Sequence, residues 1–205
     1  MVIGNPPYLR KQGLVEHYPE MTDFYEKKYT SSTGNYDIYC LFIEQSYNLI
    51  SERGIVSFIL PHKFLIADFG VGLRKFLKIN SAVSEVLHFA SSIVFADAST
   101  YTCIIGLTKS SKTDILFKHI KPEEIFDIKS WHKKSYNSLD EQQWFLTSNI
   151  VSNVLNKIES QPLKLRDVFS RFVQGIITGK DEAFCIKGEL KENFLDFTDK
   201  WGNSH

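Results

Sequence analysis

The residues best suited to chemistry stand together near the N-terminus, as Asn-Pro-Pro-Tyr at residues 5–8. Two successive prolines remove two backbone donors and fix two φ angles, so they end the short apolar strand at residues 2–3 abruptly. Asn5 and Tyr8 are therefore held on a stiff corner, one with a side-chain amide and the other with an aromatic ring. A simple turn does not need this arrangement, which indicates a binding or catalytic site.

This corner is suited to activating a weakly nucleophilic amine, such as the exocyclic amine of adenine. The lone pair of that nitrogen is delocalised into the ring, and two acceptors at a fixed angle free it by accepting the two hydrogens. The side-chain oxygen of Asn5 and the backbone carbonyl of Pro6 are two such acceptors, held rigidly as electrostatic catalysis requires. Tyr8 can stack on a base turned out of its duplex, which is worth about 1–3 kcal/mol per base.

A Pro-Pro turn with a tyrosine that only packs is the alternative for an isolated Asn-Pro-Pro-Tyr run. Here the run directly follows an apolar strand and precedes a long polar and aromatic connection over residues 9–36, with helical turns expected around residues 20–29. The corner is therefore expected at the carboxyl end of a strand, where open α/β sheets bind ligands.

The alternation of apolar runs predicts an α/β fold with a layered sheet. One helix is expected over residues 36–53, with Asn35 as its N-cap, and a second helix is expected to be capped by Asp68. Strands are expected over residues 54–61, 82–89, 101–108 and 113–120.

Three parts are expected along the chain, namely residues 1–109, 110–160 and 161–205. The first contains the layered sheet, and the second contains another strand, a polar stretch and a helix. The third begins after a Gln-Pro boundary at residues 161–162 and is expected to be the incomplete start of a new domain.

Composition excludes several classes of protein. Lys and Arg number 24 and Asp and Glu number 24, so any nucleic-acid binding must depend on local patches. The three cysteines lie far apart without metal-ligand spacing, which predicts buried thiols and no metal site. No run approaches the roughly 18 apolar residues of a membrane span, and no signal peptide is found, so a soluble cytoplasmic protein without a membrane partner is expected.

Five blocks in this order resemble the N6-adenine DNA methyltransferases, and most closely the branch found in single-chain (type IIG) restriction-modification enzymes. The blocks are VIGNPPY, YDIYCLFIEQ, GIVSFILPHKFL, FGVGLRKFL and VFADASTYTCIIGLTKS. The resemblance implies that residues 1–109 are half of a Rossmann-like methyltransferase sheet flanked by helices. It extends more loosely to residues 110–160 as a connecting region and to residues 161–205 as the beginning of a target-recognition domain.

The resemblance implies a role for each residue of the corner. Asn5 and Pro6 would bind the target amine, Pro7 would set the shape of the loop, and Tyr8 would stack on the flipped adenine. Phe95 would contact the base from its other side. The activity implied is S-adenosylmethionine-dependent methylation of adenine N6 in double-stranded DNA.

Basic residues beside the corner are candidates for contacts with DNA. Arg10 and Lys11 are expected to hold the phosphates that flank a flipped base. Seven further lysines between residues 109 and 134 form the most basic region of the chain, but a solvated surface is the simpler interpretation there.

The sequence departs from the family pattern in its cofactor-binding part. The glycine-rich loop and the acidic residues that hold S-adenosylmethionine lie upstream of the corner in the family, and this sequence has no substitute for them. We therefore expect that the cofactor-binding half is absent and that the chain alone is inactive. The strand at residues 2–3 is expected to be a sheet edge that pairs with the missing N-terminal half or with a second copy.

Two other functions remain open at this point. The same motif serves in enzymes that methylate a protein glutamine amide, although those enzymes end soon after the sheet. A non-enzymatic DNA-binding or assembly module descended from a methyltransferase also agrees with the missing cofactor half.

Overall fold

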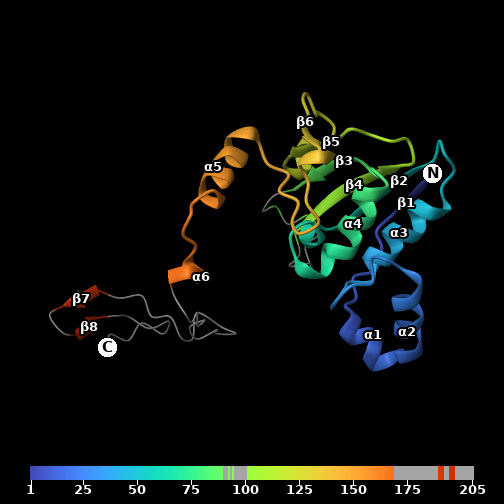
Figure 1. Ribbon diagram of the computed structural model, residues 1–205, viewed down its shortest axis with the longest axis horizontal. Coiled ribbons are helices and arrows are strands. Elements are labelled where there is room, and N and C mark those ends of the chain that lie inside the picture. The colour runs from blue at the N-terminus through green and yellow to red at the C-terminus, as the bar shows by residue number, and fades with distance from the viewer. Residues whose placement is uncertain (90–91, 93, 95–100, 169–188, 192–193, 197–205) are drawn as a thin grey trace. The chain divides into compact units, whose positions relative to one another are not determined.

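The computed structural model describes residues 1–89, 92, 94, 101–168, 189–191 and 194–196. It divides into two compact units, residues 1–155 and residues 156–205, and each is described by itself (Figure 1). In the second unit, the short helix α6 spans Leu165–Val168, and β7 (Glu189–Lys191) pairs antiparallel with β8 (Phe194–Asp196). The predicted division into three parts stays a prediction.

The first unit contains a six-stranded mixed sheet with the order β1-β2-β4-β3-β5-β6. Strands β1, β2, β3 and β5 run in one direction, and β4 and β6 run against them. The carboxyl ends of the four parallel strands therefore lie at one edge of the sheet, together with the start of β4. The strands are β1 Val2–Gly4, β2 Ile55–Pro61, β3 Val83–His88, β4 Thr102–Thr108, β5 Asp114–His119 and β6 His132–Ser135.

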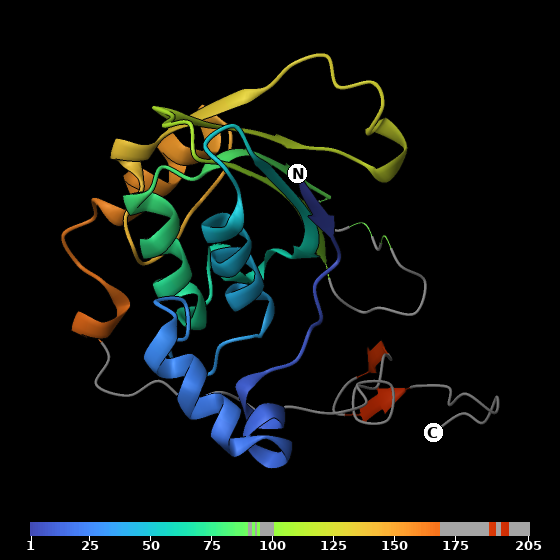
Figure 2. The same cartoon turned by 90° about the vertical axis from the view of Figure 1, so that its right-hand side faces the viewer.

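Helices α3 (Tyr39–Leu49) and α4 (Val71–Ile79) lie on one face of this sheet, as Figure 2 shows. Along the chain, helices α1 (Lys11–His17) and α2 (Pro19–Lys28) come between β1 and α3, and α5 (Asn149–Glu159) comes after the last strand of the sheet. None of the helices in the described ranges is long and apolar enough to cross a membrane. Short 3-10 turns span His62–Leu65, Asp68–Gly70, Pro122–Glu124 and Tyr136–Ser138.

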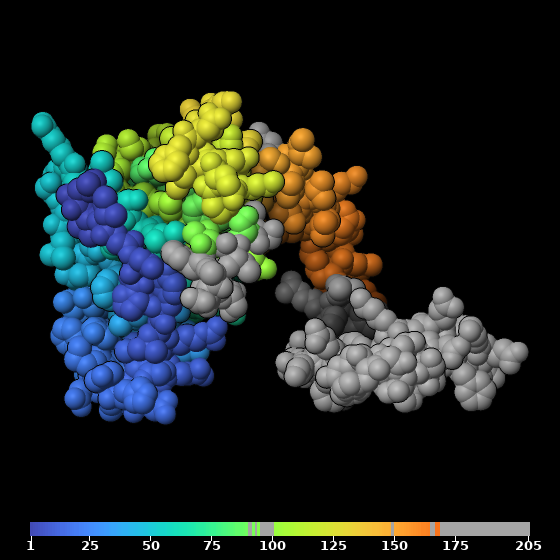
Figure 3. All heavy atoms as spheres, turned by 180° about the vertical axis from the view of Figure 1, so that it is seen from behind, coloured from blue at the N-terminus to red at the C-terminus, as the bar shows by residue number. Residues whose placement is uncertain are grey.

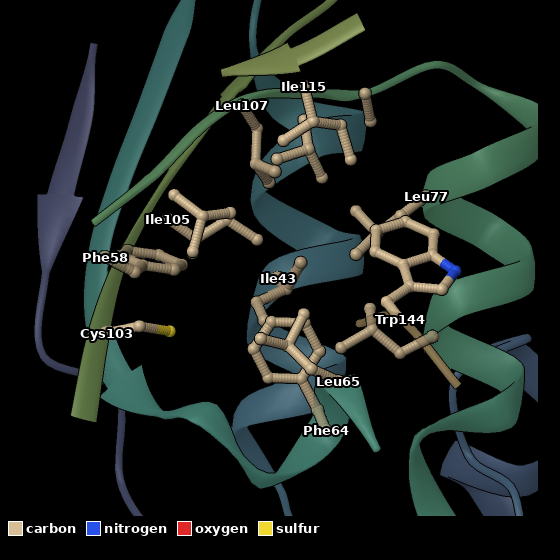
Figure 4. Close-up of a cluster of buried hydrophobic side chains, with 14 of the residues drawn as sticks. Ile43, Phe58, Phe64, Leu65, Leu77, Cys103, Ile105, Leu107, Ile115 and Trp144 are labelled. Atoms are coloured by element: carbon tan, nitrogen blue, oxygen red, sulfur yellow. The ribbon is translucent and has the colours of Figure 1, made fainter. Parts of the chain in front are cut away.

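The core lies between the sheet and the two covering helices (Figure 4). Alternate residues of β4, namely Cys103, Ile105 and Leu107, are fully buried, as the two-residue period of a strand predicts. Ile43 of α3 and Trp144 pack in the same cluster. The α/β fold with a sheet flanked by helices is therefore confirmed.

Buried thiols were expected at three positions. Cys40 and Cys103 are free and buried, and burial raises the pKa of both thiols. Cys185 lies outside the described residues.

The start of the first predicted helix is wrong by about one turn. Helix α3 begins at Tyr39, and Ile38 is its N-cap without a side-chain hydrogen bond, so Asn35 does not cap it. The chain before the helix is extended instead, because Asp37 pairs with Arg10 in an isolated β-bridge. This pairing joins the segment that follows β1 to the segment that precedes α3.

The predicted cap of the second helix is also wrong. Asp68 begins a 3-10 turn, and the N-cap of α4 is Gly70. A Cβ at Gly70 would lie 2.2 Å from the carbonyl oxygen of Phe64, so this close approach of two backbone segments requires glycine.

Arg74 of α4 is the largest charged side chain inside the core, with no exposed surface. Its guanidinium donates to the carbonyl oxygens of Phe64 and Ala67, which follow β2, and to those of Glu141 and Gln142. Arginine has five donors in a fixed fork, so one side chain holds both segments in place.

Replacing Arg74 is expected to destabilise the first unit. Arg74→Met removes the donor from four carbonyl groups, of which that of Phe64 belongs to a buried residue. We expect the free energy of unfolding to fall by about 3 kcal/mol. Lys75→Met, at an exposed position of the same helix, is the matched control. Chemical denaturation measures both variants, and equal stability of the two would contradict the role of the guanidinium.

Candidate functional site

The Asn-Pro-Pro-Tyr corner begins directly after β1, at the edge where the parallel strands end. Pro6 is buried, while Asn5, Pro7 and Tyr8 have exposed surface. The first residues of the chain, in dark blue, lie on the surface in Figure 3. The side chains of Asn5 and Tyr8, which could take part in chemistry, are therefore accessible, and Pro6 is fixed by packing.

The side chains of Tyr8 and Asn5 interact with each other. The Tyr8 hydroxyl donates to Asn5 Oδ1, and it also lies 3.3 Å from the carbonyl oxygen of Ile59 in β2. Burial raises the pKa of Tyr8, so the hydroxyl keeps its proton at neutral pH and remains a donor. Because the amide oxygen of an asparagine accepts two hydrogen bonds, Asn5 Oδ1 keeps one lone pair for a ligand.

A small cavity of about 180 Å³ lies on one side of the corner. Its walls come from the segment after β1, the segment before α3 and the turn after β2. The lining residues are Tyr8, Arg10, Asn35, Asp37, Tyr39, Pro61, Lys63 and Phe69. The cavity therefore combines three aromatic rings with two cations and one carboxylate.

Asp37 has a structural role in this cavity. Its Oδ1 accepts a hydrogen bond of 2.9 Å from the backbone N–H of Leu9, which fixes the chain that leaves the corner. Burial raises the pKa of Asp37, against the opposing effects of backbone N–H groups and of the Arg10 cation. The carboxylate is thus already engaged by the protein itself.

A larger groove of about 530 Å³ lies on the other side, between β1, β2 and α3. Asn5, Pro6 and Pro7 line it, and most of its other lining side chains are apolar, including Val2, Phe42, Leu49 and Phe58. The corner therefore separates a polar cavity from an apolar groove.

Sequence reasoning missed a row of histidines at the same edge. His62 follows β2, and its ring centroid lies 4.3 Å from that of His88 at the end of β3. The ring of His88 stacks on that of His119, at the end of β5, with 4.8 Å between centroids. Tyr101 stacks on His62 at 6.2 Å. Only the fact that each histidine ends or follows a predicted parallel strand could have signalled this row.

The structure brings some of the predicted site residues together and places others elsewhere. Asn5 and Tyr8 meet at the corner, and Arg10 lines the cavity beside Tyr8. Lys11 lies in α1, where it forms an ion pair with Glu26 of α2. Phe95 lies outside the described residues.

The fold and the corner define a mixed α/β protein with its candidate site at the carboxyl edge of the sheet. The sequence of residues 1–95 matches the family described as Eco57I restriction-modification methylase. The chain is 32% identical to the type II restriction enzyme and methyltransferase RM.Eco57I of Escherichia coli, over 94% of this chain and 20% of that protein. It is 30% identical to the type II methyltransferase M.HindII of Haemophilus influenzae, over 89% of this chain and 40% of that protein.

A solved structure gives the same fold. The match with the DrdV–DNA complex has a TM-score of 0.51 and 18% sequence identity, over 69% of this chain and 18% of that chain. At this level of identity, the similarity concerns the fold alone.

Residues 1–95 therefore match the Eco57I restriction-modification methylase family, and the chain is similar in sequence to type II methyltransferases. This confirms the relation to restriction-modification methyltransferases that the order of sequence blocks predicted, while adenine-N6 specificity stays a prediction. The chain spans 20% to 40% of the length of the first curated relatives it matches. The roles of Asn5, Pro6, Pro7 and Tyr8 stay predictions.

The histidine row makes stability depend on pH. Burial, with smaller contributions from His62 and His119, lowers the pKa of His88 from 6.5 to about 4. At a pH between these two pKa values, the unfolded chain binds more protons than the folded chain. The free energy of unfolding therefore falls as the pH is lowered from about 6.5 to 4.

Replacing His88 is expected to remove part of this dependence. In the parent protein, the free energy of unfolding falls as the pH is lowered from about 6.5 to 4. We expect this fall to be smaller by about 1–2 kcal/mol in His88→Gln, a modest amount because the ring is partly exposed. Denaturation at a series of pH values measures the slope. His17→Gln, at an exposed histidine of α1, is expected to leave it unchanged. A His88→Gln slope equal to that of the parent protein would refute the assignment.

Proposed function

We propose that this chain supplies the target-base part of a DNA adenine-N6 methyltransferase of a restriction-modification system. The observation that carries the proposal is the exposed Asn5 amide oxygen, held at the carboxyl edge of the sheet next to the rigid Pro6 carbonyl. The family of residues 1–95 supports it. Residues 161–205 are proposed to begin the target-recognition domain.

In this proposal, double-stranded DNA presents an adenine that is turned out of the duplex onto the ring of Tyr8. Asn5 Oδ1 and the Pro6 carbonyl accept the two hydrogens of the N6 amine, which localises its lone pair. The Tyr8 hydroxyl donates to Asn5 Oδ1 and so holds the amide in place, and the second lone pair of this oxygen remains for the base. These residues bind and orient the nucleophile.

S-Adenosylmethionine would supply the electrophilic methyl group. The apolar groove does not suit it, because its lining includes no Asp or Glu that would hold the ribose hydroxyls and the amino group, and Asp37 of the small cavity is already engaged by the backbone N–H of Leu9. We therefore propose that residues outside this sequence bind the cofactor.

The edge of the sheet supports a partner for this chain. β1 is the outermost strand on its side, and the side chain of Ile3 is 68% exposed. Leu49, which lines the apolar groove, is 71% exposed. An element that pairs with β1 and fills the groove would bury both side chains, and we propose that the cofactor-binding half, rather than a second copy, provides it.

Reconstitution tests the proposed function. The chain is mixed with a separately produced cofactor-binding half, S-adenosylmethionine with a labelled methyl group, and unmethylated DNA of mixed sequence. We expect label on adenine N6 with the mixture and none with either half alone. Absence of transfer, or transfer to a glutamine amide of a protein substrate, would overturn the proposal.

Removing the amide of Asn5 is expected to lower the rate of transfer in this mixture. Asn5→Ala loses one of two preorganised acceptors, and the loss of one such group typically costs about 10²–10³-fold in rate. Asn137→Ala, at an exposed position far along the sequence, is expected to keep the parent rate. Initial rates measured with saturating DNA decide the matter, and a parent-like rate for Asn5→Ala would contradict the role of the amide.

Tyr8 separates stacking from hydrogen bonding. Tyr8→Ala is expected to weaken binding of the unmethylated duplex by about 1–3 kcal/mol, because the stacking surface is lost. Tyr8→Phe keeps the ring and is expected to bind like the parent protein. Fluorescence anisotropy measures both affinities, and equal weakening in the two variants would show that the ring does not carry the base.

A further inference from the structure

The small cavity beside Tyr8 contains a cation that the sequence did not single out. Lys63 is the second residue of the 3-10 turn that follows β2, and it is exposed and lines the cavity. The ion pairs found in the described part of the chain are those of Lys11 with Glu26 and Lys129 with Asp127. Lys63 therefore has no carboxylate partner among the described residues.

Arg10, from the segment that follows β1, also lines the cavity. Its charge acts on Asp37 and lowers the pKa of that carboxyl, although burial outweighs this effect. Asp37 already accepts the N–H of Leu9, so its charge serves the loop. Two cations against one engaged carboxylate give the cavity an excess of positive charge, which favours an anionic ligand.

The position of this charge identifies the anion. The ring that carries the extruded base in the proposed function, that of Tyr8, is itself part of the cavity wall. In a nucleotide, the phosphate lies one sugar away from the base, so a base on Tyr8 brings a backbone phosphate next to this wall. Phosphate contacts of this kind set the register of a protein on DNA.

We propose that Lys63 and Arg10 together bind the phosphodiester next to the extruded adenine. This inference rests on the proposed function, and it assigns to that site a positioning pair drawn from two separate segments of the chain. Lys63 provides a mobile point charge, and Arg10 provides a planar fork that matches two phosphate oxygens.

Salt dependence tests the proposal without any methyl transfer. Binding of a mixed-sequence duplex to the full chain is measured by fluorescence anisotropy over a range of salt concentrations. Lys63→Gln and Arg10→Gln are each expected to weaken binding several-fold and to reduce the slope of log K against log salt by about 1. Lys75→Gln, at an exposed lysine of α4, is expected to keep the parent slope. A parent-like slope for Lys63→Gln overturns the proposal.

Neutral backbone linkages locate the phosphate. The probe is a duplex with one adenine opposite an abasic position, since an unpaired base is extruded at lower cost. Methylphosphonates replace the two linkages that flank this adenine, or two linkages five positions away. We expect the flanking replacements to abolish the difference between Lys63→Gln and the parent protein, and the distant ones to preserve it. The reverse pattern, or additive losses, would reject the phosphate assignment.

The two proposals fail separately. Asn5→Ala is expected to lose methyl transfer while it keeps the parent salt slope. A normal rate for Asn5→Ala with a reduced slope for Lys63→Gln would refute the base-binding corner alone. Loss of transfer in Asn5→Ala with a parent slope in Lys63→Gln would refute the phosphate pair alone.

Discussion

The parallel direction of β1 and β2 is the constraint on which the candidate site depends. The register pairs Gly4 with Phe58, so the corner begins where β2 still has three residues before its turn. The Tyr8 hydroxyl can therefore reach the carbonyl of Ile59, and Pro61 forms part of the same cavity wall. Glycine suits the last position of β1, because a Cβ there would lie 3.3 Å from the Phe58 ring.

A second anchor comes from a buried carboxylate in α3. Glu44 is 5% exposed, and its two oxygens accept the backbone N–H groups of Thr30 and Ser31 at 3.1 and 2.8 Å. These residues follow the helix pair α1–α2, so the insertion after the corner returns to the core at a fixed point. Asp37 fixes the start of the long connection at Leu9, and Glu44 fixes it again at Thr30 and Ser31, so the connection beside the site is held at both ends.

Local signals explain what the sequence predicted and contact between distant segments explains what it missed. The apolar runs predicted β1 to β5, and the two prolines predicted the corner, because each depends on neighbouring residues only. The polar strand β6 has no apolar run and was not predicted. Helix α1 was not predicted, because its sequence has no clear apolar period and no N-cap side chain. The row formed by His62 and His88, and the presence of Lys63 and Arg10 in one cavity, arise from strand order, which single residues do not encode.

The two sides of the corner place different demands on the rest of the enzyme. The apolar groove exposes side chains such as Leu49 to water, and burying them under another element would stabilise the folded protein. The polar cavity is complete within this chain, since its three wall segments are tied by Asp37 and by the hydrogen bonds of Arg74 near the turn after β2. On the proposed function, the contact of Lys63 and Arg10 with a backbone phosphate uses residues of this chain, whereas methyl transfer needs a partner. The corner is the boundary at which the two requirements meet, because Asn5 lines the groove, Tyr8 lines the cavity, and the Tyr8 hydroxyl donates to Asn5 Oδ1.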